Sequence, residues 1–141
     1  MFDPKNGLKV AVGVAPVAIG TTGTGQVGKI IDRSGYLGPV MFSIGYGSVT
    51  ATAAAFTVTV KEGDATGAMT SAADIDLIGT EAAAGLAAAA SRTSGTSKNV
   101  VKTVGYKGAK RYVQCGVKST TTAGTPVSIN AVLQPASRPA S

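Results

Sequence analysis

Apolar and polar residues alternate along several short segments of the chain, as they do in strands that have one buried and one solvated face. The clearest case is the segment 55–64, where Phe56, Val58 and Val60 alternate with two threonines and a lysine. Six further segments are predicted to form short strands: residues 26–32, 40–47, 73–79, 98–106, 111–119 and 127–133. We expect the last two segments to pair with each other as a hairpin.

The same alternation predicts which side chains point into the core. Beyond the segment 55–64, these are Val40, Phe42, Ile44, Val113, Cys115, Val117, Val127, Ile129, Ala131 and Leu133. Turn-forming residues separate the strands at intervals of roughly ten residues, which is typical of sandwiches and barrels. The predicted fold class is therefore all-β, an antiparallel β-sandwich or jelly-roll-like single domain with an extended N-terminal arm.

The start of the chain differs from the remainder, because an apolar segment precedes a loop rich in glycine and threonine. Residues 8–19 are mostly apolar but contain Pro16, which disfavours a central strand. We therefore divide the chain into an N-terminal arm with a glycine-rich hinge (1–25), a β-sandwich domain (26–134) and a flexible C-terminal tail (135–141). An ordinary first strand is an equally weighted interpretation of the apolar segment.

No membrane span or secretion signal is expected. The apolar segment is shorter than the roughly 20 residues that cross a bilayer, and residues 1–7 contain Asp3 and Pro4 where a signal peptide has a basic segment. We expect a protein made and used in a cytoplasm.

The stretch 81–90 is rich in alanine, which favours a helix, and Thr80 is a suitable N-terminal cap. Gly85 interrupts the stretch, and no broad apolar stripe runs along it. A loop or an irregular strand is therefore expected there, and its role is left open.

The net charge of +6 is unevenly distributed along the 141 residues. All seven acidic residues precede residue 91, whereas residues 91–141 carry eight basic residues and no acidic one. One interpretation is a partner with negative charge, either nucleic acid or an acidic protein surface. The favoured interpretation is that lysines keep the strands soluble and protect sheet edges.

The residue types point away from catalysis. The chain contains no histidine, which excludes Ser-His-Asp and Cys-His nucleophiles, and its single cysteine, Cys115, is expected to be a buried thiol. Asp74 and Asp76 would share one face of a strand, as a weak calcium or acid–base site or, as we favour, as part of a solvated face. No catalytic residue, metal ligand or cofactor is predicted, so we expect a protein that is not an enzyme.

Gly23, Gly25 and Gly28 match the spacing G-x-G-x-x-G of a dinucleotide-binding turn. Such a turn must open a helix, but Gly35 follows only seven residues after Gly28. Nucleotide binding is therefore not expected. We interpret Gly20, Gly23 and Gly25 as a hinge that lets the arm leave the domain.

Three short motifs occur in a recurring order along the chain. They comprise Ile31, Asp32, Ser34, Gly35 and Tyr36; Val58, Val60, Glu62, Gly63 and Asp64; and Gly105, Tyr106, Gly108, Lys110, Arg111, Tyr112 and Val113. With these motifs the segment from about residue 26 to 133 resembles a group of small virion proteins of tailed bacteriophages, encoded among head genes.

The resemblance implies a capsid decoration, or cement, protein on the outer surface of the virion, with the major capsid protein as its partner. A homotrimer is the expected assembly, and nucleic acid is not expected as a partner. The alternatives are a head–tail connector or tail component, and a nucleic-acid-binding module that uses the basic C-terminal half. The candidate partner contacts are Leu8, Val10, Val12, Val14, Val17, Ile19, Lys107, Lys110 and Arg111.

Overall fold

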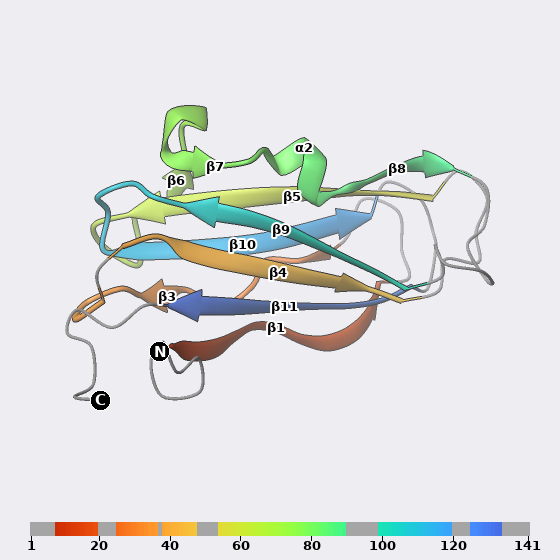
Figure 1. The fold of residues 1–141 in the computed structure, drawn as a ribbon, viewed down its shortest axis with the longest axis horizontal. Helices are drawn as coiled ribbons and strands as arrows, with labels where there is room; N and C mark the ends of the chain where they lie inside the picture. Colours follow the sequence, from red (N-terminus) through yellow and green to blue (C-terminus); the bar gives the residue numbers. More distant parts are fainter. Residues whose placement is uncertain are drawn as a thin grey trace, which may run out of the picture.

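The computed structural model describes residues 8–19, 25–36, 38–47, 54–89, 99–119 and 125–133. Its strands form two antiparallel sheets that pack face to face (Figure 1), so the predicted all-β sandwich is confirmed. The five strands of the first sheet, sheet A, are in spatial order β1 (Lys9–Ile19), β11 (Thr125–Leu133), β4 (Val40–Tyr46), β9 (Val100–Tyr106) and β7 (Leu77–Ile78).

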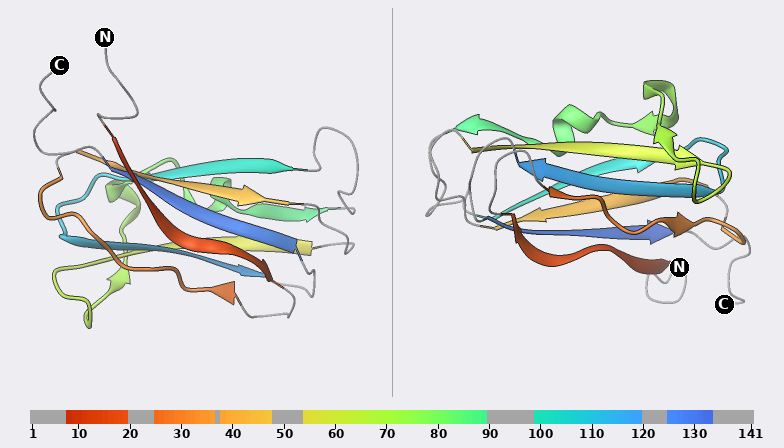
Figure 2. Two further views of the ribbon diagram at one scale, coloured as in Figure 1. Left: turned by 90° about the horizontal axis from the view of Figure 1, so that it is seen from below. Right: turned by 180° about the vertical axis from the view of Figure 1, so that it is seen from behind.

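The second sheet, sheet B, is built around two long strands, β10 and β5, which Figure 2 shows in front in its right-hand view. Its strands are β2 (Gly25–Gln26), β10 (Tyr112–Ser119), β5 (Ala54–Gly63) and β6 (Thr70–Ser71) in spatial order, with β3 (Ile31–Asp32) also on β10 and β8 (Leu86–Ala89) on β5.

The core lies between the inner faces of the two sheets. Every side chain that the alternation assigns to the core is buried, because successive side chains of a strand point to opposite faces. The largest fully buried side chains include Tyr106, Phe42, Phe56, Ile44, Ile129 and Leu133. The interpretation of Cys115 as a buried thiol is confirmed, since the residue is 1% exposed.

The predicted hairpin between residues 111–119 and 127–133 is wrong. β10 pairs with β5 in sheet B, whereas β11 pairs with β1 and β4 in sheet A. Both strands bury alternate residues, but they bury them from opposite sides of the same core. An alternating pattern fixes which face of a strand is buried and leaves open which strand lies beside it.

The chain start also differs from the predicted arm. Residues 9–19 form the edge strand β1, which pairs antiparallel with β11 from Lys9↔Leu133 to Ile19↔Thr125. Pro16 is accommodated because an edge strand leaves one side of its backbone unpaired. The alternative interpretation, an ordinary first strand, describes these residues. Residues 1–7 and 20–24, which include Gly20 and Gly23 of the predicted hinge, lie outside the described residues, as does the predicted tail (135–141), whereas Gly25 begins β2 and pairs with Lys118.

Two short helical turns replace parts of the expected strands and loops. Asp74–Asp76 form a 3₁₀ turn before β7, so these aspartates do not share a strand face. Glu81–Ala84 form one turn of helix, α2, whose N-terminus is capped by the Thr80 hydroxyl accepting a hydrogen bond from the Ala83 amide. Strand β8 follows α2 directly. Within the described residues, no helix has the length and apolar character needed to span a membrane.

Candidate functional site

Three segments that are far apart in the sequence meet at one end of sheet B. Asp32 and Ile31 pair with Tyr112 and Val113 on one side of β10, and β5 pairs with the same two residues through Gly63 and Glu62 on the other side. The motifs that carry the family resemblance are therefore one structural unit. We use the name end cluster for the side chains that gather there, which are Asp32, Arg33, Glu62, Asp64, Tyr106, Lys110 and Arg111.

Arg33 is the centre of the end cluster. Its Nη1 donates to the carbonyl oxygens of Gly108 and Lys110, both at 2.8 Å, and its Nη2 donates to that of Gly38 at 3.1 Å. The guanidinium carbon lies 5.0 Å from the centroid of the Tyr106 ring, within the range of a cation–π contact. One side chain therefore fastens the loop after β3 to the loop between β9 and β10.

Tyr106 extends this network into the core. Its hydroxyl donates to the carboxylate of Glu62 and accepts from the backbone amide of Lys110 at 3.2 Å. Burial, together with the hydrogen bond to Glu62, raises the pKa of Tyr106 to about 12. The phenol therefore remains a proton donor at neutral pH, and it joins β9 to β5 across the two sheets.

Two exposed ion pairs flank this centre. Lys110 Nζ lies 2.8 Å from Asp64 Oδ2, and Arg111 donates through two nitrogens to the two carboxylate oxygens of Asp32 at 2.9 Å each. The Arg111 hydrogen bonds and the Ser34 amide lower the pKa of Asp32 to about 2, while Asp64 raises the pKa of Lys110. Because both pairs are exposed, they contribute geometry more than stability.

The predicted basic contacts Lys107, Lys110 and Arg111 do lie near one another, but they do not form a patch of uncompensated positive charge. Lys110 and Arg111 each face a carboxylate. Lys107 is exposed, and its backbone amide donates to the Asp76 carbonyl oxygen at 2.8 Å. A surface that attracts nucleic acid needs positive charge that phosphate can neutralise, and two of these three side chains already have a partner.

Replacing Arg33 by alanine is expected to lower the free energy of unfolding by about 2–4 kcal/mol, because three carbonyl groups lose a charged donor. Lys118→Ala, at an exposed position of β10, is the matched control and is expected to change stability by less than about 0.5 kcal/mol. Urea denaturation measures both. Equal losses in the two variants would show that Arg33 does not hold the loops together.

The predicted apolar contacts of residues 8–19 are divided between the two faces of β1. Val10 and Val12 are 63% and 46% exposed, whereas Val14 is buried. A register shift between Val12 and Val14 changes the face to which the following side chains point. Val17 packs against the core and Leu8 is half-buried, while the side chain of Ile19 lies outside the described residues.

The outer face of sheet A carries no charged side chain in its paired rows, and one of these rows is apolar. Its first row runs across all five strands through the paired residues Val10, Val132, Met41, Gly105 and Ile78. Further rows contain Val12, Asn130, Ser43 and Thr103, and then Ser128, Gly45 and Val101. The outer face of sheet B differs, because Thr57, Thr59, Lys61 and Lys118 alternate with its buried residues.

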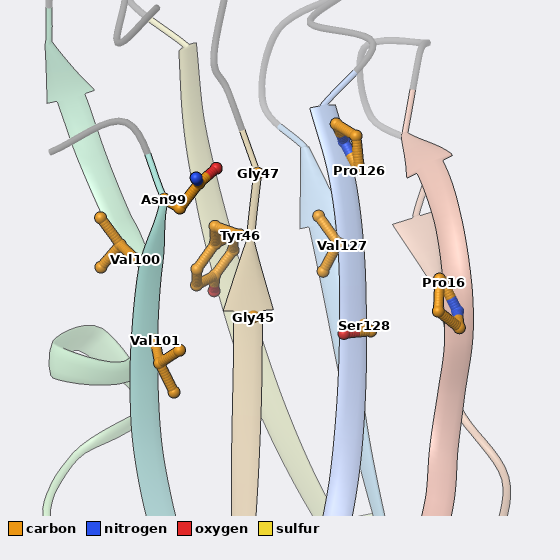
Figure 3. Close-up of a pocket in the computed structure, with 10 residues that line it drawn as sticks. All are labelled: Pro16, Gly45, Tyr46, Gly47, Asn99, Val100, Val101, Pro126, Val127 and Ser128. Atoms are coloured by element: carbon orange, nitrogen blue, oxygen red, sulfur yellow. The ribbon is translucent and has the colours of Figure 1, made fainter. Parts of the chain in front are cut away.

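A shallow hollow of about 300 Å³ lies at the far end of this outer face (Figure 3). It follows β4 at Gly45 and Gly47, which carry no side chains, between Val101 on one side and Pro16 and Pro126 on the other. Met41 precedes Gly45 by four residues on the same strand. The face therefore has an apolar ridge at one end, formed by the side chains of Val10, Val132, Met41 and Ile78 in the first row, and a hollow at the other.

Only part of this surface was among the predicted contacts. The signal for the remainder is present in the segments 40–46 and 100–106, in which residues of both faces are apolar or uncharged except Lys102. A strand exposed to water on one face carries polar residues there, so Met41 and Val101 at outward positions are the informative departures from the pattern.

The glycine motif has a structural use at its last position. Gly28 has a φ of +84°, its carbonyl accepts from Gln114 Nε2 at 2.8 Å, and the next amide donates to the Gly13 carbonyl oxygen at 2.7 Å. Strand β3 follows it, where a dinucleotide site would need a helix. Gly23 lies outside the described residues.

Among the residues that the structure describes, no three acidic or cysteine side chains are grouped so that they could hold a metal ion.

No family model matches the chain, and no curated protein matches it. Among solved structures, the PBSX exported protein XepA matches with a TM-score of 0.54 and 12% identity, over 94% of this chain and 39% of XepA. This chain therefore spans about two fifths of the length of that protein. The match shows that the β-sandwich fold is shared, and fold alone does not fix a role.

Weaker matches come from proteins of different kinds. A chain in the acid-stable capsid structure of Helicobacter pylori bacteriophage KHP30 has a TM-score of 0.47 and 9% identity, over 92% of this chain and 94% of that one. The C-terminal CBM6 of LamC from Zobellia galactanivorans has a TM-score of 0.46 and 11% identity, over 94% of this chain and 96% of that one. The structures similar to this chain thus include both phage proteins and carbohydrate-binding modules.

Proposed function

We propose that this chain is a non-enzymatic virion protein of a tailed bacteriophage that binds the outside of the capsid and stabilises the shell of major capsid protein. The observation that carries this proposal is the end cluster. The three motifs on which the family resemblance rests come from separate parts of the chain, yet their side chains bond to one another around Arg33. A resemblance whose parts form one unit of structure is more specific than three loose motifs.

The architecture suits such a role. A sandwich whose loops are tied at one end by Arg33 and Tyr106 is a rigid body, and a rigid body loses little conformational freedom when it binds. Many copies on a symmetric shell would each need only weak contacts, because repetition turns weak binding into high avidity.

The alternatives make different predictions. A head–tail connector or tail component would occur as one small symmetric ring per particle, whereas a decoration protein covers the shell in many copies. A nucleic-acid-binding module would use the basic residues near β10, but Lys110 and Arg111 are paired with Asp64 and Asp32. Binding to a DNA fragment at low salt, weakening steeply as salt rises, would support the module.

The decisive experiment adds the purified protein to expanded shells that lack it, made from the major capsid protein of the same phage. We expect saturable binding in many copies per particle and a higher melting temperature of the shell. Arg33→Ala is the informative variant, since a loosened end cluster should weaken binding, and Lys118→Ala is its control. Absence of binding, or binding of a single ring of copies at one vertex, would contradict the proposal.

A further inference from the structure

We infer that the outer face of sheet A is the surface through which two copies of this chain pack together, sheet against sheet, about a two-fold axis. The inference goes beyond the proposed function and does not depend on it. It starts from the exposure of Val10, Met41, Ile78 and Val101, which are between 43% and 67% exposed. Large apolar side chains gathered on one face of a monomer mark an interaction surface.

The distribution of charge identifies a second copy as the occupant. The chain carries a net charge of +6, so the net electrostatic force between two copies is repulsive. The three rows of this face contain no charged side chain, whereas the outer face of sheet B carries Lys61 and Lys118. An uncharged face is where two like-charged copies can approach without desolvating or opposing lysines.

The relief of the face is complementary to itself. The ridge of Val10, Val132, Met41 and Ile78 lies at one end of the strands, and the hollow at Gly45 lies about 13 Å away at the other end. A two-fold axis between the sheets, running across the strands near Ser43, places Met41 of each copy over the hollow of the other. Such an interface is isologous, because each copy contributes the same residues.

The size of the face predicts a dimer of moderate affinity. Four strands about 4.8 Å apart and about 23 Å long, together with the two-residue strand β7, outline roughly 500 Å² per copy. Two copies then bury about 1,000 Å², at the lower limit of specific interfaces. The dimer is therefore expected to dissociate on dilution. The trimer expected from the family resemblance is a different assembly, and a mass measurement separates the two.

The test is sedimentation velocity of the full chain at several concentrations. The wild-type protein is expected to shift from the chain mass of 13.9 kDa to twice that mass as the concentration rises. Met41→Lys places a charge at the centre of the ridge and is expected to weaken dimerisation at least about tenfold. Thr59→Lys, an equal change on the outer face of sheet B, is expected to leave dimerisation unchanged. Melting curves check that both variants are folded.

Salt provides a second readout. Dimerisation through an uncharged face between like-charged copies is expected to strengthen as salt screens their repulsion. The inference would be overturned by a protein that is monomeric at all concentrations or trimeric. It would also be overturned if salt weakened dimerisation, or if the two lysine variants had equal effects on it. If the protein is monomeric and Met41→Lys abolishes shell binding, the face serves the capsid and the dimer is wrong. A Met41-dependent dimer that does not bind shells would sink the proposed function alone.

Discussion

Replacing Gly28 by alanine is expected to lower the free energy of unfolding by about 3–5 kcal/mol, which is near the upper end for a single substitution. Two causes add at this position. The φ of +84° is a conformation that alanine adopts at a cost of about 1–2 kcal/mol. In addition, a Cβ would lie 2.1 Å from the carbonyl oxygen of Cys115, which is far inside contact distance.

The clash with the Cys115 carbonyl oxygen cannot be relieved by a small local movement. Cys115 lies in the middle of β10 and pairs with Val60 of β5, so its carbonyl cannot withdraw without distorting sheet B. If Gly28 withdraws instead, the hydrogen bonds from Gln114 Nε2 to its carbonyl and from the Lys29 amide to Gly13 are lost. Those bonds hold the connection between β2 and β3 against β10 and β1.

Gly35→Ala is the matched control, because it separates the two causes. Gly35 has a φ of +83°, but no atom lies within 4 Å of the position that its Cβ would take. Its substitution is therefore expected to cost only the conformational part, about 1–2 kcal/mol. Denaturant unfolding of both variants measures the difference. Similar losses at the two glycines would show that the approach to Cys115 is unimportant.

The buried faces of the strands were predictable from sequence because one physical rule governs them. Alternate residues of a strand point to opposite sides, so Phe42, Val58, Val113 and Ile129 could be assigned to the core without knowing their neighbours. Pairing was less accessible. β10 and β11 follow each other in sequence, and their inward residues suit a hairpin and a pair of opposing sheets equally well.

The chain start shows a different limit. A bulge between Val12 and Val14 changes which face is buried, and the alternation of valines alone gives no sign of it. The single-turn helix α2 at Glu81–Ala84 is likewise held by a tertiary contact, since the Tyr46 hydroxyl donates to the Ala84 carbonyl oxygen at 2.8 Å. Contacts between distant residues are not encoded in local periodicity.

The sequence was sufficient to identify most residues of the end cluster, but not to predict that they lie side by side. The motifs at residues 31–36, 62–64 and 105–113 could be recognised singly, but their meeting around Arg33 depends on β10 pairing with both β3 and β5. Arg33 itself stands at a position that the motif leaves open. Lys110 and Arg111 were expected to face a partner, and the acidic residues that neutralise them lie 46 and 79 positions away.

Raising the pH above about 9 is expected to destabilise the fold, and the thiol of Cys115 is expected to respond first. Burial raises the pKa of this thiol from its ordinary 9.0 to about 12. Burial also raises the pKa of Tyr106 from 10.0 to about 12 and that of Tyr46 above its ordinary value. All three groups are buried in the core between the two sheets. Burial disfavours their ionised forms, because water cannot solvate a charge there.

The sign follows from proton binding. At a pH between a group's pKa in the unfolded chain and its higher pKa in the folded chain, the unfolded chain has released the proton while the folded chain retains it. Rising pH in this range therefore favours unfolding. Each such group costs up to about 1.4 kcal/mol per pH unit. For Cys115, which is 1% exposed, this amounts to about 3 kcal/mol between pH 9 and about pH 11, and the tyrosines add to the loss above pH 10.

Urea denaturation at a series of pH values from 8 to 11 measures this loss. Cys115→Ala is the control, because it removes the thiol and leaves both tyrosines in place. The variant is expected to be less stable at pH 8 by about 1–2 kcal/mol from the cavity, but to keep its stability constant until the tyrosines respond near pH 10. If the variant and the wild-type protein begin to lose stability at the same pH, the thiol is not the group that responds first, and Cys115 is less completely desolvated than its position between the sheets requires.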